Sequence, residues 1–280
     1  MATLLAVETG GTKIVARQTG PDGERVGRWP TATPAQALAD IAGFVDRAPA
    51  AIGIAAFGPL VLEGADAGRM RATTKPHWTG SNLARDLGGR FGCPVAVDSD
   101  VNAAARAELA ADGAAASLAY VTVGTGIGGG LAMAGGTLRG AMHPEIGHLR
   151  LIRRGGDDAP SMCPFHADCA EGLAAGPALG RRLAGATLAE RPDVAALLAD
   201  YLGQLLTALV LAWAPHRIVL GGGVGSAAGV LPAVRRAFAD ALGDYGVPEA
   251  ARAPDFLRAP VHADAGLEGA LLMARAAAGA

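Results

Sequence analysis

Short apolar runs of strand length alternate with stretches of helical spacing along the chain. The runs at residues 3–7, 51–56, 95–97, 118–123 and 217–220 are rich in Val, Ile, Leu and Ala, which predicts buried strands. Helices are predicted where apolar positions recur every three or four residues or strong helix formers gather, at residues 34–48, 82–91, 103–111, 173–188, 193–213, 231–242 and 266–278. Strands that alternate with helices in this way predict an α/β protein.

Two glycine-rich turns each lie between two strands. The first, residues 8–13, precedes a β-branched stretch at residues 14–18, and the second is residues 124–130. Neither turn opens a helix, so neither is a Walker loop, and the second is not a dinucleotide motif although it contains G-x-G-x-x-G. Glycine and threonine in such a hairpin can cradle phosphate, and a plain tight turn explains the first stretch equally well. The repeat predicts two related domains, residues 1–112 and 113–280, with the last helix able to pack back on the first.

A third glycine stretch, residues 221–225, follows the strand at residues 217–220 and precedes a helix. This order fits a nucleotide base or ribose that packs on the loop. A Rossmann site is the alternative interpretation, but no complete βαβ unit with a suitably placed acid follows.

Asp100 lies where the strand at residues 95–97 gives way to a helix. An aspartate at this position can cap the helix N-terminus or act as a catalytic base. The two roles are compatible, and the residues alone leave both open.

Potential metal ligands gather in residues 142–172. His148 is followed, fourteen residues later, by Cys163-Pro-Phe-His166-Ala-Asp-Cys169. Two thiols and two imidazoles suit a tetrahedral Zn²⁺ ion, and four protein ligands leave no open position, so the ion is expected to be structural. Glu145 and Glu171 flank these ligands, so the ion would hold acidic groups around a polar substrate. Two free buried thiols with an incidental histidine are the alternative.

The bulk composition narrows the class of protein. With 280 residues, 51% of them apolar, the chain can bury a sizeable core in one large or two medium domains. The 24 basic and 26 acidic residues form no basic run, so nucleic acid is not an expected partner. No cationic leader precedes Glu8, and the longest apolar run, near residues 205–214, is shorter than the about 20 residues that span a bilayer. We therefore expect a soluble cytoplasmic protein without a membrane segment.

Taken together, five motifs resemble those of the ROK-family sugar kinases and cover nearly the whole chain. They are Glu8-x-Gly10-Gly11-Thr12-Lys13, Asp100-Val101-Asn102, Gly124-Thr125-Gly126-Ile127-Gly128-Gly129-Gly130, Glu145-x-Gly147-His148 and Gly221-Gly222-Gly223-Val224. A second set is similar to the bacterial fructokinases of that family: Phe57-Gly58-Pro59, Thr74-Lys75-Pro76-x-Trp78, His143-Pro144-Glu145 and Cys163-x-x-His166-x-x-Cys169. The resemblance implies a two-domain actin-like ATPase fold of the hexokinase type, which is ribonuclease-H-like, with a cleft between the domains.

The resemblance also implies a role for each motif. Asp100 would be the general base that deprotonates the attacking sugar hydroxyl, with ATP and Mg²⁺ as cofactors. The nucleotide and its phosphates would be held by Gly10, Gly11, Thr12, Lys13, Gly124, Thr125, Gly126, Gly221, Gly222 and Gly223. The sugar hydroxyls would be bound by Asn102, Glu145, His148 and Glu171. The zinc ligands would be His148, Cys163, His166 and Cys169, so His148 would serve both the metal and the sugar.

Two positions depart from the usual pattern of the family. Glu8 stands where many members have aspartate, which leaves its contact with Mg²⁺ open, and His77 stands where a glycine is usual before Trp78.

The function expected from the resemblance is ATP-dependent phosphorylation of D-fructose to fructose 6-phosphate, in an enzyme that is a homodimer. The alternatives are a ROK kinase of glucose, mannose or an N-acetylhexosamine, and a catalytically silent sugar-binding protein. A ROK transcriptional repressor is not expected, because the first glycine turn begins within ten residues of Met1 and leaves no room for a helix-turn-helix.

Overall fold

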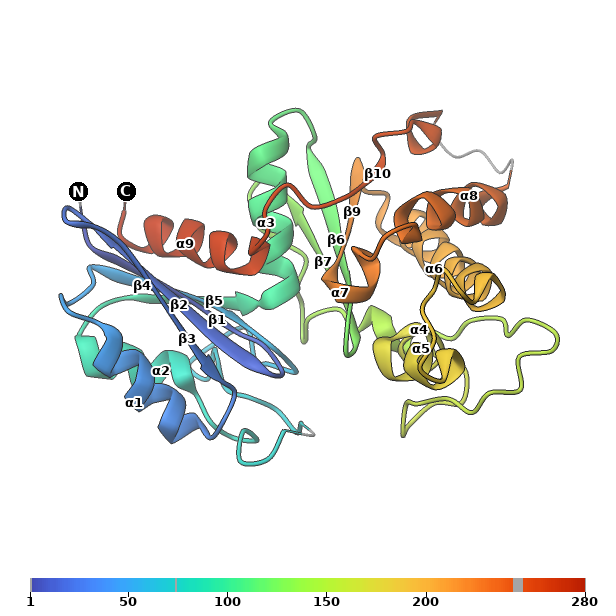
Figure 1. Ribbon diagram of the computed structural model, residues 1–280. Coiled ribbons are helices and arrows are strands. Elements are labelled where there is room, and N and C mark those ends of the chain that lie inside the picture. The colour runs from blue at the N-terminus through green and yellow to red at the C-terminus, as the bar shows by residue number, and fades with distance from the viewer. Residues whose placement is uncertain (1, 74, 244–248, 280) are drawn as a thin grey trace. The chain divides into compact units, whose positions relative to one another are not determined.

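The computed structural model describes residues 2–73, 75–243 and 249–279, and its chain divides into two compact units (Figure 1). One unit consists of Met1–Gly113, Ala132–His143 and Val261–Ala280, and the other of Ala114–Leu131 and Pro144–Pro260. Residues 132–143 belong to the first unit, although the sequence analysis placed them in the C-terminal domain. Residues 261–280, which include the last helix that was expected to be able to pack back, also belong to the first unit. Each unit contributes strands and helices, which confirms the predicted α/β class.

The first unit is built on a five-stranded sheet in the order β3-β2-β1-β4-β5. The strands are β1 (Leu4–Thr9), β2 (Lys13–Gly20), β3 (Gly23–Pro30), β4 (Ala51–Ala56) and β5 (Val95–Ser99). The first three pair antiparallel as a meander, whereas β1, β4 and β5 run parallel. The β3 strand is exposed along most of its length and carries little apolar signal, which explains why hydrophobic periodicity did not predict it.

Helices cover both faces of this sheet. Alternate side chains of β1 point to opposite faces and therefore pack against different helices. Leu5 and Val7 join a core with α1 (Pro34–Phe44) and α2 (Leu83–Phe91), whereas Leu4 and Ala6 join a second core with α9 (Ala265–Ala277). Figure 1 shows α9 along one face of the sheet and α1 with α2 on the other. The continuous apolar run in β1 is thus the signature of a strand buried on both faces.

Helix α9 lies unusually close to its neighbours. A Cβ atom at Gly53 of β4 would collide with the backbone of Ala270, and one at Gly269 would collide with the carbonyl of Ala103 in α3 (Asp100–Asp112). Two glycines therefore allow backbone-to-backbone packing, which ties α9 to both the sheet and the helix that carries Asp100.

The second sheet has the order β10-β9-β6-β7-β8. Its strands are β6 (Ser117–Val123), β7 (Ile127–Met133), β8 (Gly136–Thr137), β9 (Arg217–Gly221) and β10 (Leu257–Arg258). The strands β6, β9 and β10 are parallel, and β7 pairs antiparallel with β8. The helical segments of the second unit are η1 (Ile146–His148), α4 (Ala170–Ala174), α5 (Gly176–Leu183), α6 (Pro192–Trp213), α7 (Gly222–Gly225), α8 (Val230–Leu242) and η2 (Glu249–Arg252).

Two details of this unit differ from the sequence expectation. The helix expected at residues 173–188 is two shorter helices, α4 and α5, that meet at Ala175. The glycine loop after β9 contains a single helical turn, α7. Both differences are local, because glycine and proline at 176–177 allow the chain to change direction between α4 and α5.

Helix α6 is the one described helix that is long and apolar enough to cross a membrane, by length and composition alone. The apolar run that the sequence analysis judged too short is thus part of a 22-residue helix. Of the most apolar 18-residue stretch of this helix, 56% is buried in the structure. Gly203 of α6 lies against the backbone of Ala237 in α8, so the helix packs closely in the core of its unit.

Candidate functional site

Asp100 is the first residue of α3, directly after strand β5. The helix cap is its neighbour Ser99, whose side chain accepts a hydrogen bond from the backbone N–H of Asn102 at 3.2 Å. The suggestion that Asp100 itself caps the helix was therefore wrong. Because Ser99 satisfies one of the free N–H groups of the first turn, the carboxylate of Asp100 is not needed as the cap.

The surroundings of Asp100 raise its pKa to about 7. Burial is the main cause, because it disfavours the charged carboxylate, and the negative charge of Glu8 acts in the same direction. The backbone N–H of Val101, which donates to Oδ1 at 2.9 Å, and the nearby His143 counteract part of this effect. A carboxylate with a pKa near neutral is suited to take up and release a proton at physiological pH.

The first glycine turn joins β1 to β2 next to Glu8. The N–H of Gly10 donates to the carbonyl of Lys13 at 2.8 Å, and Thr31 Oγ1 donates to the carbonyl of Gly10 at 2.7 Å. Gly11, Thr12 and Lys13 are exposed at the tip of the hairpin. Of the residues that the sequence analysis assigned to phosphate in this turn, these three are therefore accessible to a ligand, whereas the N–H and the carbonyl of Gly10 hold the turn together.

Glu8 lies between charges of both signs. Burial raises the pKa of its carboxyl group, as does Asp264, whereas Lys13 and the N–H of Leu267 lower it. A Cβ atom at Gly266 would lie 2.7 Å from Glu8 Oε1, so this glycine makes room for the carboxylate. Lys13 is thus held near a carboxylate that itself influences Asp100.

Asn102 is fully buried and is oriented by two acceptors. Its Nδ2 donates to Asp98 Oδ1 at 2.9 Å and to the carbonyl of Leu138 at 3.2 Å. The second oxygen of Asp98 accepts from Thr137 Oγ1 at 2.6 Å. Asp98 and Thr137 were not among the predicted site residues, since only the folded chain brings residues 137–138 beside α3.

In the second unit, the glycine turn at residues 124–126 is held at both ends. The carbonyl of Gly124 accepts from the N–H of Gly176 at 2.7 Å, and the N–H of Ile127 donates to Glu171 Oε2 at 3.0 Å. Gly126 must lack a side chain, because a Cβ atom there would lie 2.6 Å from Glu171 Oε2. The turn, which was predicted to bind the nucleotide, is therefore in direct contact with Glu171, which was predicted to bind the sugar.

The third glycine segment lies beside the second. A Cβ atom at Gly124 would be 4.0 Å from the backbone N of Gly223, so the two glycine segments are neighbours. Gly222 has a φ of +82° and packs against the carbonyl of Val123, and Gly221 packs against the Tyr120 hydroxyl. These two glycines have a packing role in addition to the proposed nucleotide role, whereas Gly223 faces open space.

His148, Cys163, His166 and Cys169 converge as the sequence analysis proposed for a zinc site. One ligand atom from each lies within 4.8 Å of all the others. Cys163 Sγ is 3.7 Å from His148 Nδ1 and 3.6 Å from His166 Nδ1. In a tetrahedral zinc site with bonds of about 2.0–2.3 Å, neighbouring ligand atoms are separated by about 3.3–3.8 Å. The donor set and its spacing therefore fit Zn²⁺.

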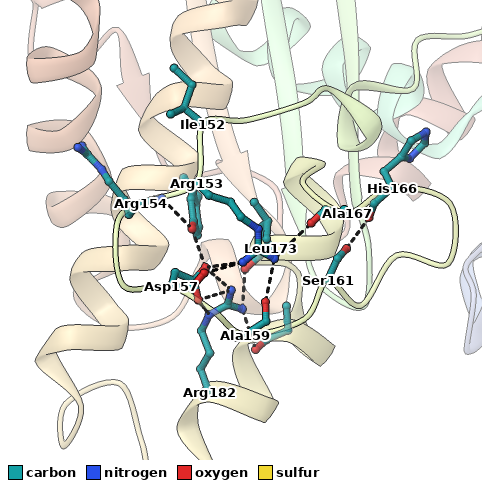
Figure 2. Close-up of polar contacts among 12 residues, drawn as sticks. Ile152, Arg153, Arg154, Asp157, Ala159, Ser161, His166, Ala167, Leu173 and Arg182 are labelled. Carbon is teal, nitrogen blue, oxygen red and sulfur yellow. Dashed lines mark hydrogen bonds and ion pairs between the residues drawn. The ribbon is translucent and has the colours of Figure 1, made fainter.

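The loop that carries Cys163 and His166 is anchored by buried charges (Figure 2). Arg182 of α5 donates to both carboxylate oxygens of Asp157, at 3.1 and 2.7 Å, and Tyr201 Oη of α6 donates to Oδ2 at 2.6 Å. Burial alone would raise the pKa of Asp157, but these two partners lower it below its usual value. Arg153 adds bonds to the carbonyls of residues 157, 159 and 167. The loop is thus held by side chains from two helices, α5 and α6.

The remaining predicted positions are simpler. Glu145 is exposed and precedes η1, and its carbonyl accepts from the N–H of His148 at 3.0 Å. His77 has a φ of +69°, the left-handed conformation that favours glycine, which gives a physical reason for the glycine usual there. Trp78 is buried and packs edge-on against Phe57, with 5.0 Å between the ring centroids. Thr74 lies outside the described residues.

Comparisons with known proteins agree with this geometry. The chain is 36% identical to a fructokinase of Pediococcus pentosaceus, over 97% of both chains, and 38% identical to a fructokinase of Zymomonas mobilis, over 85% of both. Its fold is similar to that of a ROK family glucokinase from Streptomyces griseus solved with glucose and AMPPNP, with a TM-score of 0.73 and 25% identity over 98% of this chain and 99% of that one. The fold is therefore of the actin-like ATPase type, as expected. Since the model of the ROK family matches residues 4–277, nearly the whole length, the chain belongs to the ROK family.

Proposed function

We propose that this protein is an ATP-dependent fructokinase that transfers the γ-phosphate of ATP to the 6-hydroxyl of D-fructose. The observation that carries the proposal is Asp100, a carboxylate of near-neutral pKa at the start of a helix, in a chain whose relatives over most of its length are fructokinases. The glucokinase neighbour binds AMPPNP, an ATP analogue, which supports ATP as the phosphate donor.

In the proposed reaction, the deprotonated carboxylate of Asp100 accepts the proton of the sugar 6-hydroxyl. The oxygen attacks the γ-phosphorus, the bond to the β–γ bridging oxygen breaks, and ADP leaves. Positioned proton transfer of this kind typically contributes about 10²–10⁴-fold to the rate. Positioning and charge neutralisation supply most of the remaining acceleration in phosphoryl transfer.

The nucleotide would be held by the glycine segments at residues 10–12, 124–126 and 221–223, with Lys13 as a cation for the phosphates. Phosphate suits these segments because their glycines allow close backbone approach. Mg²⁺, when bound with ATP, neutralises the phosphate oxygens. Glu8 lies near both Lys13 and Asp100 in the first unit. It is therefore the candidate carboxylate that would contact the water molecules around that ion.

The sugar hydroxyls would be bound by Asn102, Glu145, His148 and Glu171. In His148, Nδ1 faces the cysteine cluster, so Nε2, on the other side of the ring, is left for the sugar. A Zn²⁺ ion held by His148, Cys163, His166 and Cys169 would fix the orientation of that ring when bound. The role of the ion is structural, because the four ligands complete a tetrahedral shell.

A second candidate function is phosphorylation of another hexose. The glucose in the S. griseus neighbour favours this alternative, because choice among sugars depends on a few hydroxyl contacts.

We also propose a homodimer located in the cytoplasm, with no nucleic-acid partner. Exposed Ile152 and Phe165 in the loop of the metal cluster support a protein contact there, and light scattering at several concentrations tests it.

The function is tested by ADP release with Mg·ATP across fructose, glucose, mannose, N-acetylglucosamine and N-acetylmannosamine. The wild-type protein is compared with Asp100→Asn and with Glu63→Gln, which removes an exposed carboxylate from the same unit. We expect fructose to give the highest kcat/KM, and only Asp100→Asn to lower turnover, by about 10²–10⁴-fold. A preference for another sugar would overturn the fructose assignment and retain the kinase, whereas no turnover with any sugar would overturn both.

A further inference from the structure

The backbone of Ile127, directly after the glycine turn at residues 124–126, touches both segments that carry zinc ligands. Its N–H donates to Glu171 in α4, two residues after Cys169. On its other side, a Cβ atom at Gly147 would collide with the carbonyl of Ile127, so the η1 segment that ends at His148 packs directly on this strand. One residue, Ile127, therefore links the turn to both segments of the metal cluster through its N–H and its carbonyl.

The segment that presents Glu171 is itself well defined. Cys169 Sγ caps α4 by accepting the N–H of Gly172 at 3.4 Å, and the carbonyl of Gly172 accepts the N–H of Met162 at 2.9 Å. Gly172 lies so close to Cys163 and Ser161 that a Cβ atom would collide there. The position of Glu171 is therefore set by the same residues that form the metal cluster.

Glu171 uses only one of its two carboxylate oxygens for the turn. Oε2 accepts the Ile127 N–H at 3.0 Å and lies over Gly126, where a side chain would displace it. A carboxylate has about four acceptor directions, so Oε1 remains for a sugar hydroxyl. The same group can thus contact the sugar and fix the turn at once.

We propose that Glu171 is a positioning residue for the nucleotide-phosphate turn at residues 124–126, in addition to its role as a sugar ligand. Together with the bond from Gly176 N–H to the Gly124 carbonyl, it holds the turn in the conformation in which the turn would bind phosphate. The inference deepens the proposed function and rests on it. It means that the region built around Cys169 affects nucleotide affinity as well as sugar affinity.

The test measures the affinity of Mg·AMPPNP by calorimetry without any sugar, so that the sugar role of Glu171 does not contribute. Glu171→Gln keeps an oxygen that can accept the Ile127 N–H, whereas Glu171→Met has a similar length and no comparable acceptor. We expect Glu171→Met to bind the nucleotide about tenfold more weakly and Glu171→Gln to stay within about twofold of the wild type. Both variants are expected to raise the KM for the sugar.

Each outcome separates this inference from the proposed function. If both variants bind AMPPNP as tightly as the wild type, the positioning role is wrong, while kinase activity of the wild type leaves the function intact. If Glu171→Gln binds AMPPNP as weakly as Glu171→Met does, an oxygen that accepts the Ile127 N–H does not preserve nucleotide affinity. The inference is then also wrong. Zinc content and the circular dichroism spectrum of Glu171→Met are measured alongside, and Glu171→Asp, which keeps the charge on a shorter side chain, replaces it if the methionine variant does not fold.

Discussion

The amide of Asn102 is oriented by Asp98, four residues earlier in the chain, through a bond of 2.9 Å from Nδ2 to Oδ1. The second partner of Nδ2 is a carbonyl, that of Leu138, so both neighbours are acceptors and the nitrogen must point toward them. The amide oxygen of Asn102 has no hydrogen-bond partner among the described residues. A buried acceptor that is left unpaired is costly, so it is a natural partner for a donor hydroxyl.

Removing the carboxylate of Asp98 is therefore expected to weaken sugar binding more than nucleotide binding. In Asp98→Ala the amide of Asn102 loses the nearer of its two acceptors and keeps only the carbonyl of Leu138, so it is less firmly oriented. We expect the KM for the sugar to rise about tenfold. The matched control is Thr137→Val, which removes the hydroxyl bonded to the other oxygen of Asp98 and leaves the contact with Asn102. Steady-state kinetics with each substrate varied in turn gives both KM values. An equal rise in both would argue against an orienting role for Asp98.

The pH dependence of the reaction should report the pKa of Asp100. A general base must be deprotonated, so kcat/KM should rise with pH to a plateau, with a midpoint near 7. Glu8→Gln removes a negative charge that raises this pKa, so the midpoint should move to lower pH, whatever happens to the plateau. A profile whose midpoint is the same in both proteins would contradict the assignment of Glu8 as a cause.

The same raised pKa affects stability in the opposite direction. Because the folded state holds the proton of Asp100 more tightly than the unfolded chain does, the stabilisation from this proton is complete below pH about 4 and is lost as the pH rises through about 7. Asp100→Asn removes the buried charge, so its melting temperature should exceed that of the wild type at pH 8 and not at pH 4. Thermal unfolding at the two pH values checks this, and a difference that does not change with pH would contradict it.

The cluster of His148, Cys163, His166 and Cys169 predicts one zinc ion per chain. Mass spectrometry of the purified protein should find close to one equivalent, and a chelator should lower the melting temperature. The matched variants are Cys169→Ser, which removes a ligand, and Cys93→Ser, which removes a thiol outside the cluster. Only the first should lose the metal, and zinc well below one equivalent in the wild type would remove the site.

Glu108 makes a further prediction about stability. This fully buried carboxylate on α3 accepts the N–H groups of Val261 and His262 at 2.9–3.0 Å, where the chain enters its last segment of the first unit. Glu108→Gln replaces one acceptor oxygen with an NH₂ group that cannot accept, so we expect a loss of about 1–3 kcal/mol in the free energy of unfolding. Urea denaturation measures it, with Glu63→Gln as the exposed control. Equal stability of the two variants would contradict the argument.

The sequence by itself predicted the elements whose signal is local. The apolar run of β1, the glycine turn after it and the strand-to-helix junction at Asp100 are patterns of neighbouring residues, and backbone sterics and hydrophobic burial act on them directly. The spacing of Cys163, His166 and Cys169 belongs to the same class, since three residues on a short loop can reach one ion without help from the rest of the fold. The exposed strand β3 was not predicted, because it carries no apolar periodicity.

Only the tertiary structure decided how these local elements act on one another. The pKa of Asp100 depends first on its burial and then on the charges of Glu8 and His143, which lie far away in the sequence. The orientation of Asn102 depends on a carbonyl 36 residues later. The contact of Glu171 with Ile127 joins residues 44 apart. Burial, charge interactions and hydrogen bonds act through distance in space, and the sequence spacing of the partners carries no information about that distance until the chain has folded.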